Sequence, residues 1–241
     1  MKIKFLVYSI FLLSSISCQR TVKESTEERT CTNLSVKIVA AMKDVMWKGQ
    51  LSSSIDLDTI SDKVGLYGLG PVSYLSGEIL INNGINYVSK VTSDTTMIVE
   101  KTFNTSAPFF VYTNVNHWNE VELPPEVKTI QDLELYIDRL TSKHQRPFAF
   151  RLEGTINNAT IHVQNLPPGT KVSSPEEAHQ GQTNYPLVNV EAQIIGFFST
   201  EHQGVFTHHD SFLHMHLITQ DESKMGHLDQ LEIDQMKLFL P

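Results

Sequence analysis

Residues 212–218 read FLHMHLI, and this stretch decides how the second half of the chain folds. Polar and apolar side chains alternate through it, which is typical of a β-strand, because successive side chains of a strand point to opposite faces. His214 and His216 therefore share one face, whereas the leucines and the methionine between and around them share the other. We expect the apolar face to pack in the core and the histidine face to be free to bind a ligand.

A second strand is predicted to pair with this one in a hairpin. A polar stretch follows the first strand, and the alternation resumes at His227. A hairpin that turns at residues 221–222 places His216 opposite His227 and His214 opposite Asp229. Cross-strand neighbours lie about 5 Å apart at Cβ, so three imidazoles can converge on one ion without help from distant parts of the sequence.

Three neutral imidazoles with an open fourth position form a common ligand set for a catalytic zinc ion. We therefore predict that His214, His216 and His227 bind Zn²⁺, and that Asp229 accepts a hydrogen bond that fixes the tautomer of one imidazole. The alternative is a group of surface histidines without a metal. Three further histidines of the same region are interpreted as surface residues of a polar loop: His202, His208 and His209.

Composition limits both the class of protein and the chemistry of the site. The chain has 241 residues, of which 40% are hydrophobic and 19% charged, and these values exclude a disordered or polytopic membrane protein. Its net charge of -8 argues against a nucleic-acid partner, because there is no excess of basic side chains to bind phosphates. Cys18 and Cys31 are the two cysteines. A four-thiolate site is therefore excluded, and any metal must bind imidazole or carboxylate.

The N-terminus has the layout of an export signal. Residues 1–17 contain two lysines, an apolar run and small residues, which is typical of a secretory signal peptide. Cys18 follows directly, as in a bacterial lipobox, so we predict a lipoprotein signal; the alternative is an ordinary cleaved signal. Residues 19–34 are polar and are interpreted as a tether. The predicted location is exported, either periplasmic or anchored in the membrane through a lipid on Cys18.

The remaining residues, 35–241, are predicted to form an α+β domain. Residues 78–88 indicate a β-hairpin with an Asn-Asn-Gly turn, and Thr129 with Asp132 indicates the start of a helix. We expect a mixed β-sheet with few helices in the N-terminal part. The C-terminal part is expected to be mostly antiparallel β-structure that carries the metal site, with a boundary between two subdomains near residue 145.

Several moderate motifs follow one another along this domain. They are the glycine-rich loop Gly65–Gly70, Leu75–Ile79, Ala107–Phe109, Phe148–Gly154 around Arg151, Ile195–Phe197, the His-x-His pair and Gly226-His227. None of them is decisive alone. Their common order, from about Val36 to Pro241, resembles the bacterial α-acetolactate decarboxylases.

The resemblance implies a fold, a reaction and a set of site residues. The reaction is the conversion of 2-acetolactate to acetoin and carbon dioxide, usually by a homodimer. Carried over to this chain, the resemblance implies His214, His216 and His227 as zinc ligands, Glu78 as the active-site glutamate of a strand, and Arg151 as the active-site arginine.

The sequence departs from the family pattern in two places. The glycine-rich loop of the family continues with threonine, where this chain has Pro71, so a hydroxyl contact is expected to be missing. Family members also extend beyond the last strand and supply a second glutamate from that tail, whereas this sequence reads to Pro241. Our hypothesis is that Glu232 or Asp229 takes over its part in proton delivery.

The reaction explains why these residue types are needed. Loss of carbon dioxide leaves an electron pair that must be delocalised as an enediolate, and zinc that chelates the hydroxyl and ketone oxygens would stabilise this charge. Arg151 offers a planar fork of donors to orient the carboxylate; its alternative role is a salt bridge with Glu153. Glu78 would protonate the enediolate if its pKa is raised; its alternative role is that of a solvated strand carboxylate.

Two other classes of function stay open at this point. A cupin-like metalloenzyme also uses His-x-His on a strand with a later histidine, but the glutamate that usually follows the pair is replaced here by Gln220 and Asp221. An exported lipoprotein that binds a metal or a small acid without turnover could keep the same fold. Formation of acetoin from acetolactate, with and without a chelator, separates these hypotheses.

Overall fold

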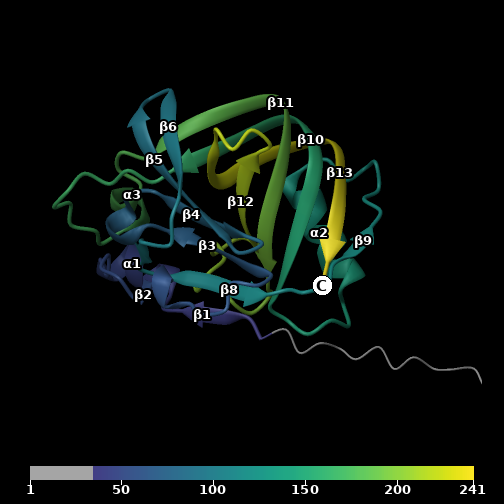
Figure 1. Ribbon diagram of the computed structural model, residues 1–241, viewed down its shortest axis with the longest axis horizontal. Coiled ribbons are helices and arrows are strands. Elements are labelled where there is room, and N and C mark those ends of the chain that lie inside the picture. The colour runs from purple at the N-terminus through teal and green to yellow at the C-terminus, as the bar shows by residue number, and fades with distance from the viewer. Residues whose placement is uncertain (1–34) are drawn as a thin grey trace, which may run out of the picture. The chain divides into compact units, whose positions relative to one another are not determined.

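The computed structural model describes residues 35–241, which fold into two large β-sheets, a small two-stranded sheet and short helices (Figure 1). The predicted signal peptide (1–17), lipid site (Cys18) and tether (19–34) lie outside these residues. None of the helices in the described part is both long and apolar enough to cross a membrane.

The first sheet has six strands in the order β1-β8-β3-β4-β5-β6. Their bounds are β1 (Lys37–Val39), β3 (Leu66–Pro71), β4 (Glu78–Asn82), β5 (Ile85–Ser93), β6 (Thr96–Lys101) and β8 (Phe110–Asn114). The predicted hairpin joins β4 to β5, and its turn residues Asn83 and Gly84 have φ angles of 49° and 80°, which asparagine and glycine tolerate best. The prediction of a mixed sheet is wrong, because each strand pairing of this sheet is antiparallel, both between successive strands and between β8 and its neighbours β1 and β3.

The second sheet holds most of the C-terminal half, in the order β10-β11-β12-β13-β9. Its strands are β9 (Asn119–Val121), β10 (Phe148–Val163), β11 (Thr183–Phe198), β12 (Leu213–Thr219) and β13 (Met225–Leu240). The predicted antiparallel β-structure is confirmed, and β10 pairs with both β11 and β13, so that four strands close into a ring (Figure 1). β9 precedes residue 145, the predicted subdomain boundary, and nevertheless belongs to this sheet.

Short elements connect and cover the sheets. They are α1 (Met42–Lys48), α2 (Ile130–Leu140), α3 (Pro175–Ala178), the strands β2 (Ile55–Asp56) and β7 (Ser106–Ala107), and 3-10 turns at Leu57–Thr59 and Ser73–Leu75. The predicted start of α2 is confirmed: Thr129 and Asp132 form a reciprocal capping box, which stabilises a helix by about 1 kcal/mol. Leu133 and Ile137 anchor α2 in the core.

Apolar side chains of the two large sheets meet in one cluster. The first sheet contributes Tyr67 and Leu69, and the second contributes Ile195 and Phe197. Ile195 in β11 pairs with His216 in β12, and directly paired residues project to the same face of a sheet. The histidine face of the second sheet is therefore the face that packs against the first sheet.

Candidate metal centre

Three neighbouring strands of the second sheet place one histidine each at the same level. His216 in β12 pairs with His227 in β13, and His227 pairs in turn with His162 in β10. These three side chains therefore project to one face. His214 lies two residues before His216 and shares that face, because side chains of a strand alternate. The fold thus gathers four histidines, of which the sequence predicted three.

The predicted zinc ligands come together. One ring nitrogen from each of His214, His216 and His227 lies within 4.8 Å of the other two. Adjacent corners of a tetrahedral zinc site are about 3.3 Å apart, because a Zn–N bond is about 2.0–2.1 Å long, so binding of an ion would draw the rings closer together. The predicted pairing of His216 with His227 is confirmed. The predicted pairing of His214 with Asp229 is wrong, because β13 leaves β12 at this point and pairs with β10.

Burial and unpaired nitrogens suit these side chains to a metal ion. His214, His216 and His227 are 3%, 0% and 8% exposed. Nδ1 of His214 and both ring nitrogens of His216 make no hydrogen bond of good geometry among the described residues, although backbone groups of Phe206 and Ile79 lie close to these rings. A buried polar atom without a partner costs about 1–3 kcal/mol, which ligation of a metal would offset.

Loss of solvation keeps these imidazoles neutral. Burial lowers the pKa of His214 and His227 well below the usual value for histidine, and it lowers the pKa of His216 to about 3. Neutral imidazole is the form that ligates a metal. The donor set, the burial and the charge state therefore all fit a divalent cation.

The predicted glutamate reaches this cluster from the first sheet. Glu78 begins β4 opposite Pro71 of β3, and it is 2% exposed. Its carboxylate oxygens lie 3.7 Å from His216 Nε2 and 4.0 Å from His162 Nε2, and the backbone N–H of Gln164 donates to Oε1 at 3.3 Å. Burial raises the pKa of the Glu78 carboxyl well above its usual value despite that hydrogen bond. The alternative of a solvated carboxylate is therefore wrong.

The predicted arginine does not join the cluster. The guanidinium carbon of Arg151 lies 4.2 Å from the ring centroid of Phe239 and 5.8 Å from that of Trp118. Its Nη1 is 3.6 Å from a carboxylate oxygen of Glu153. Arg151 is not among the residues that line the cavity beside the histidines. These contacts match the alternative that the sequence offered, a salt bridge with Glu153.

His162 is the site residue that sequence reasoning missed. Its Nδ1 lies 2.8 and 2.9 Å from the two carboxylate oxygens of Asp229, and its ring centroid is 4.7 Å from that of His227. Asp229 therefore does hold an imidazole, as predicted for this carboxylate, but it holds the imidazole of His162. The close approach of β13 to β10 needs Gly226, because a Cβ there would clash with the carbonyl oxygen of His162.

The three loop histidines have different surroundings. His209 is exposed, as predicted. His202 hydrogen-bonds to Ser199 through Nδ1 at 2.7 Å and stacks on Phe206. His208 contradicts the surface interpretation, because its Nε2 lies 3.3 Å from Nε2 of His227. No local sequence signal separates His208 from its exposed neighbour.

A small cavity borders the cluster. Its volume is about 20 Å³, which is space for about one water molecule. Its lining combines apolar side chains with histidines, one carboxyl group and one amide. The residues are Met42, Met46, Pro71, Leu75, Glu78, Phe109, His162, Gln164, His179, His208, His214 and His227. No arginine or lysine stands in this wall of the described part of the chain.

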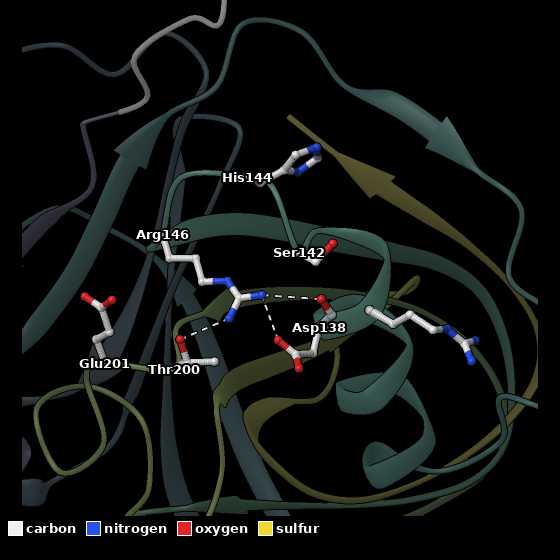
Figure 2. Close-up of a pocket in the computed structure, with 7 residues that line it drawn as sticks. Asp138, Ser142, His144, Arg146, Thr200 and Glu201 are labelled. Carbon is white, nitrogen blue, oxygen red and sulfur yellow. Dashed lines mark hydrogen bonds and ion pairs between the residues drawn. The ribbon is translucent and has the colours of Figure 1, made fainter.

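A wider recess of about 500 Å³ lies elsewhere on the protein and shares no lining residue with this cavity (Figure 2). Its Arg146 is already engaged, since Nη2 lies 2.7 Å from Asp138 and Nη1 donates to Thr200 at 3.0 Å (Figure 2). The recess therefore lacks the metal-binding cluster, and the histidine cavity is the candidate site.

Comparison with known proteins assigns this chain to a family. The model of the α-acetolactate decarboxylase family matches residues 39–240. The chain belongs to the α-acetolactate decarboxylase family. The match confirms the resemblance drawn from the sequence, and with it the prediction of a decarboxylase. The cupin-like alternative is not needed.

Relatives and solved structures agree with this family. The α-acetolactate decarboxylase of Lactococcus lactis subsp. cremoris is 29% identical over 174 residues, which is 71% of this chain and 70% of the relative. The enzyme of Lactococcus lactis subsp. lactis is 30% identical over the same shares. The crystal structure of α-acetolactate decarboxylase from Bacillus subtilis strain 168 shares the fold, with a TM-score of 0.69 at 21% identity over 85% of this chain and 83% of that one.

Proposed function

We propose that this member of the α-acetolactate decarboxylase family converts 2-acetolactate to acetoin and carbon dioxide with a zinc ion held by His214, His216 and His227. The observation that carries the proposal is a buried group of neutral imidazoles with unpaired nitrogens beside a carboxyl group whose pKa is raised. Imidazole donors suit zinc as well as copper, iron and nickel, and zinc is the ion that the family resemblance implies. When bound, zinc would supply Lewis-acid stabilisation of the charge that develops on the hydroxyl and ketone oxygens of the substrate.

Glu78 supplies the proton that replaces carbon dioxide. Burial raises its pKa and so favours the protonated carboxyl group, which is the form that can act as a general acid. The N–H of Gln164 holds one of its oxygens in place. Glu78 approaches from β4, across from the sheet that carries the histidines. Delivery of the proton from this single side would give a product of one handedness.

The wall of the cavity favours loss of the carboxylate. Met42, Met46, Leu75 and Phe109 line it, and Arg151 does not. These apolar side chains disfavour a charged carboxylate relative to neutral carbon dioxide on their part of the wall, whereas Glu78, Gln164 and five histidines form the rest of it.

Acetoin formation tests the proposal. Purified protein is incubated with racemic 2-acetolactate, with and without a chelator, and acetoin is measured over time. We expect acetoin in the presence of zinc, its loss after chelation and its return when zinc is added back. Absence of acetoin at every metal loading would overturn the proposed reaction.

A second function is binding of a metal or small acid without turnover. The observation that favours it is the volume of about 20 Å³ beside the cluster, which is far below the usual volume of a ligand pocket. Binding of zinc without formation of acetoin would support this function.

The proposal includes export and a homodimer. Export rests on residues 1–17 and the lipid anchor on Cys18, and the dimer rests on the family resemblance. Mass spectrometry of the mature N-terminus tests export and the lipid anchor. Light scattering of the purified protein tests the homodimer.

A further inference from the structure

A short segment carries His208 over the histidine cluster. We call residues 208–210, in the connection from β11 to β12, the histidine strap. Thr207, before the strap, is fully buried. After it, the hydroxyl of Ser211 and the N–H of Phe212 donate to one carboxylate oxygen of Glu134 in α2, at 2.6 and 2.7 Å. The strap therefore spans three residues between two fixed points.

His208 is the one strap residue that turns inward. Its ring is half-buried, with its centroid 5.1 Å from that of His227 and 6.4 Å from that of His214. The side chains of the next two residues, His209 and Asp210, are 90% and 73% exposed. Few contacts therefore hold the outer part of the strap in place, and it can move at low cost.

The spacing of two ring nitrogens indicates what His208 does. Nε2 of His208 is 3.3 Å from Nε2 of His227. This is about the distance between two corners of a tetrahedron of nitrogens around zinc, given Zn–N bonds of about 2.0–2.1 Å.

We propose that His208 is a fourth, displaceable ligand of the metal, which closes the site until substrate takes its place. The cavity of about 20 Å³ admits about one water molecule, and a branched hydroxy-keto acid needs more space. Withdrawal of His208 would free a coordination position and enlarge the cavity in one movement. This inference rests on the metal site of the proposed function, but not on its substrate.

Cobalt(II) reports the number of ligands directly, because four-coordinate cobalt absorbs visible light far more strongly than cobalt with five or six ligands. Full-chain protein is loaded with Co²⁺ alone, and its spectrum is compared with that of His208→Ala. We expect intense bands in the unaltered protein and bands of different position and intensity in the variant, because water replaces one imidazole at the metal. The affinity for Co²⁺ should fall about 10- to 100-fold, the scale on which loss of a supporting group weakens a metal site.

His209→Ala is the matched control, because His209 is the neighbouring strap histidine and is exposed. It should leave both the spectrum and the affinity unchanged. Acetohydroxamate, a small bidentate oxygen ligand, then probes access to the metal: it should bind the His208→Ala protein more tightly, because no internal ligand has to be displaced. Equal spectra and equal affinity in the unaltered protein and His208→Ala would overturn the proposal.

X-ray absorption of the unaltered zinc protein gives a test that needs no variant. Four imidazoles around zinc support the fourth ligand, whereas three imidazoles overturn it. The outcomes also separate the two proposals. Cobalt spectra that depend on His208, in a protein that forms no acetoin, would remove the proposed reaction and keep this inference. Acetoin formation by a protein whose zinc has three imidazole ligands would keep the proposed reaction and remove the fourth ligand. Failure to bind either zinc or cobalt would overturn both metal assignments.

Discussion

Arg151 near the start of β10 and His162 near its end lie on one strand but in different surroundings. Arg151 packs over Phe239 and pairs with Glu153. His162 is held by Asp229 and lies beside the metal-binding cluster. One end of β10 therefore uses its charged side chain for packing, and the other end brings its side chain to the site.

This difference shows that position along a strand, and not only residue type, selects a site residue. The residue opposite His162 in β13 is His227, whereas the residue opposite Arg151 in the same strand is Phe239. The pairing of β10 with β13 contains three register shifts between these positions. Arg151 also pairs with Ile195 in β11, which pairs with His216, so Arg151 projects to the same face as the histidines and is separated from them by its position along the strand. The predictions below test whether function follows the His162 end.

Replacing His227 with alanine is expected to have the largest effect. The change removes the ring that pairs with His216 and contacts His162. We expect loss of stoichiometric zinc, measured by elemental analysis, and loss of acetoin formation; His214→Ala should behave in the same way. The exposed His209→Ala serves as the control. Zinc retained at full stoichiometry in both site variants would contradict the ligand assignment.

Glu78→Gln should keep zinc and lose rate. The amide preserves the shape of the side chain but cannot donate a carboxyl proton, so we expect kcat to fall about 10²- to 10⁴-fold. Glu153→Gln, which changes the carboxylate beside Arg151, is the control and should leave kcat unchanged. A Glu78→Gln protein with normal kcat would exclude Glu78 as the proton donor.

Acidification should destabilise the metal-free protein. Buried histidines with lowered pKa values, His208, His214, His216 and His227, bind fewer protons folded than unfolded at pH values below about 6.5. The free energy of unfolding therefore falls as pH drops below that value, by up to about 1.4 kcal/mol per pH unit for each group.

Glu78, with its raised pKa, acts in the opposite direction: it destabilises the fold as pH rises above about 4.5. Several histidines oppose this one carboxyl, so the histidines should dominate between about pH 5 and 6.5. Denaturant unfolding of chelator-treated protein at several pH values measures the sum. Zinc should reduce the slope, since ligation opposes protonation. A stability that rises on acidification in this range would contradict neutral burial of the histidines.

His162→Gln should weaken the site without abolishing it. The change removes the ring between Asp229 and Glu78, and loss of such a supporting group costs about 10- to 100-fold in metal affinity or activity. Zinc affinity and kcat are both measured. Asp229→Asn should reproduce part of the loss, and an unchanged His162→Gln protein would remove the functional difference between the two ends of β10.

Arg151→Gln is expected to have the smallest effect. It removes a cation–π contact with Phe239, which is worth about 1 kcal/mol, so Tm should fall by about 2–4 °C. Zinc content and kcat should stay the same. A fall in kcat like that of Glu78→Gln would instead support the role that the family resemblance implied for Arg151.

Local patterns in the sequence predicted the parts of the structure that depend on near neighbours. The hairpin that pairs His216 with His227 follows from a period of two and one turn, and the start of α2 follows from Thr129 and Asp132. His162 comes to the site through a pairing between β10 and β13, which are far apart in the chain and joined by an irregular register. No local pattern contains that register. The position of His208 depends on how a loop is anchored, and the periodicity of strands does not predict this either.

Glu78 comes from one sheet and the imidazoles from the other, which makes the chemistry modular. Changes in β3 and β4 could alter the placement of the acid, and with it the stereochemistry of the product, while the ion-holding half stays as it is. The reverse also holds, since a different metal could be accepted in β12 and β13 without moving the acid. Directed evolution of this scaffold could therefore treat selectivity and metal preference as separate libraries.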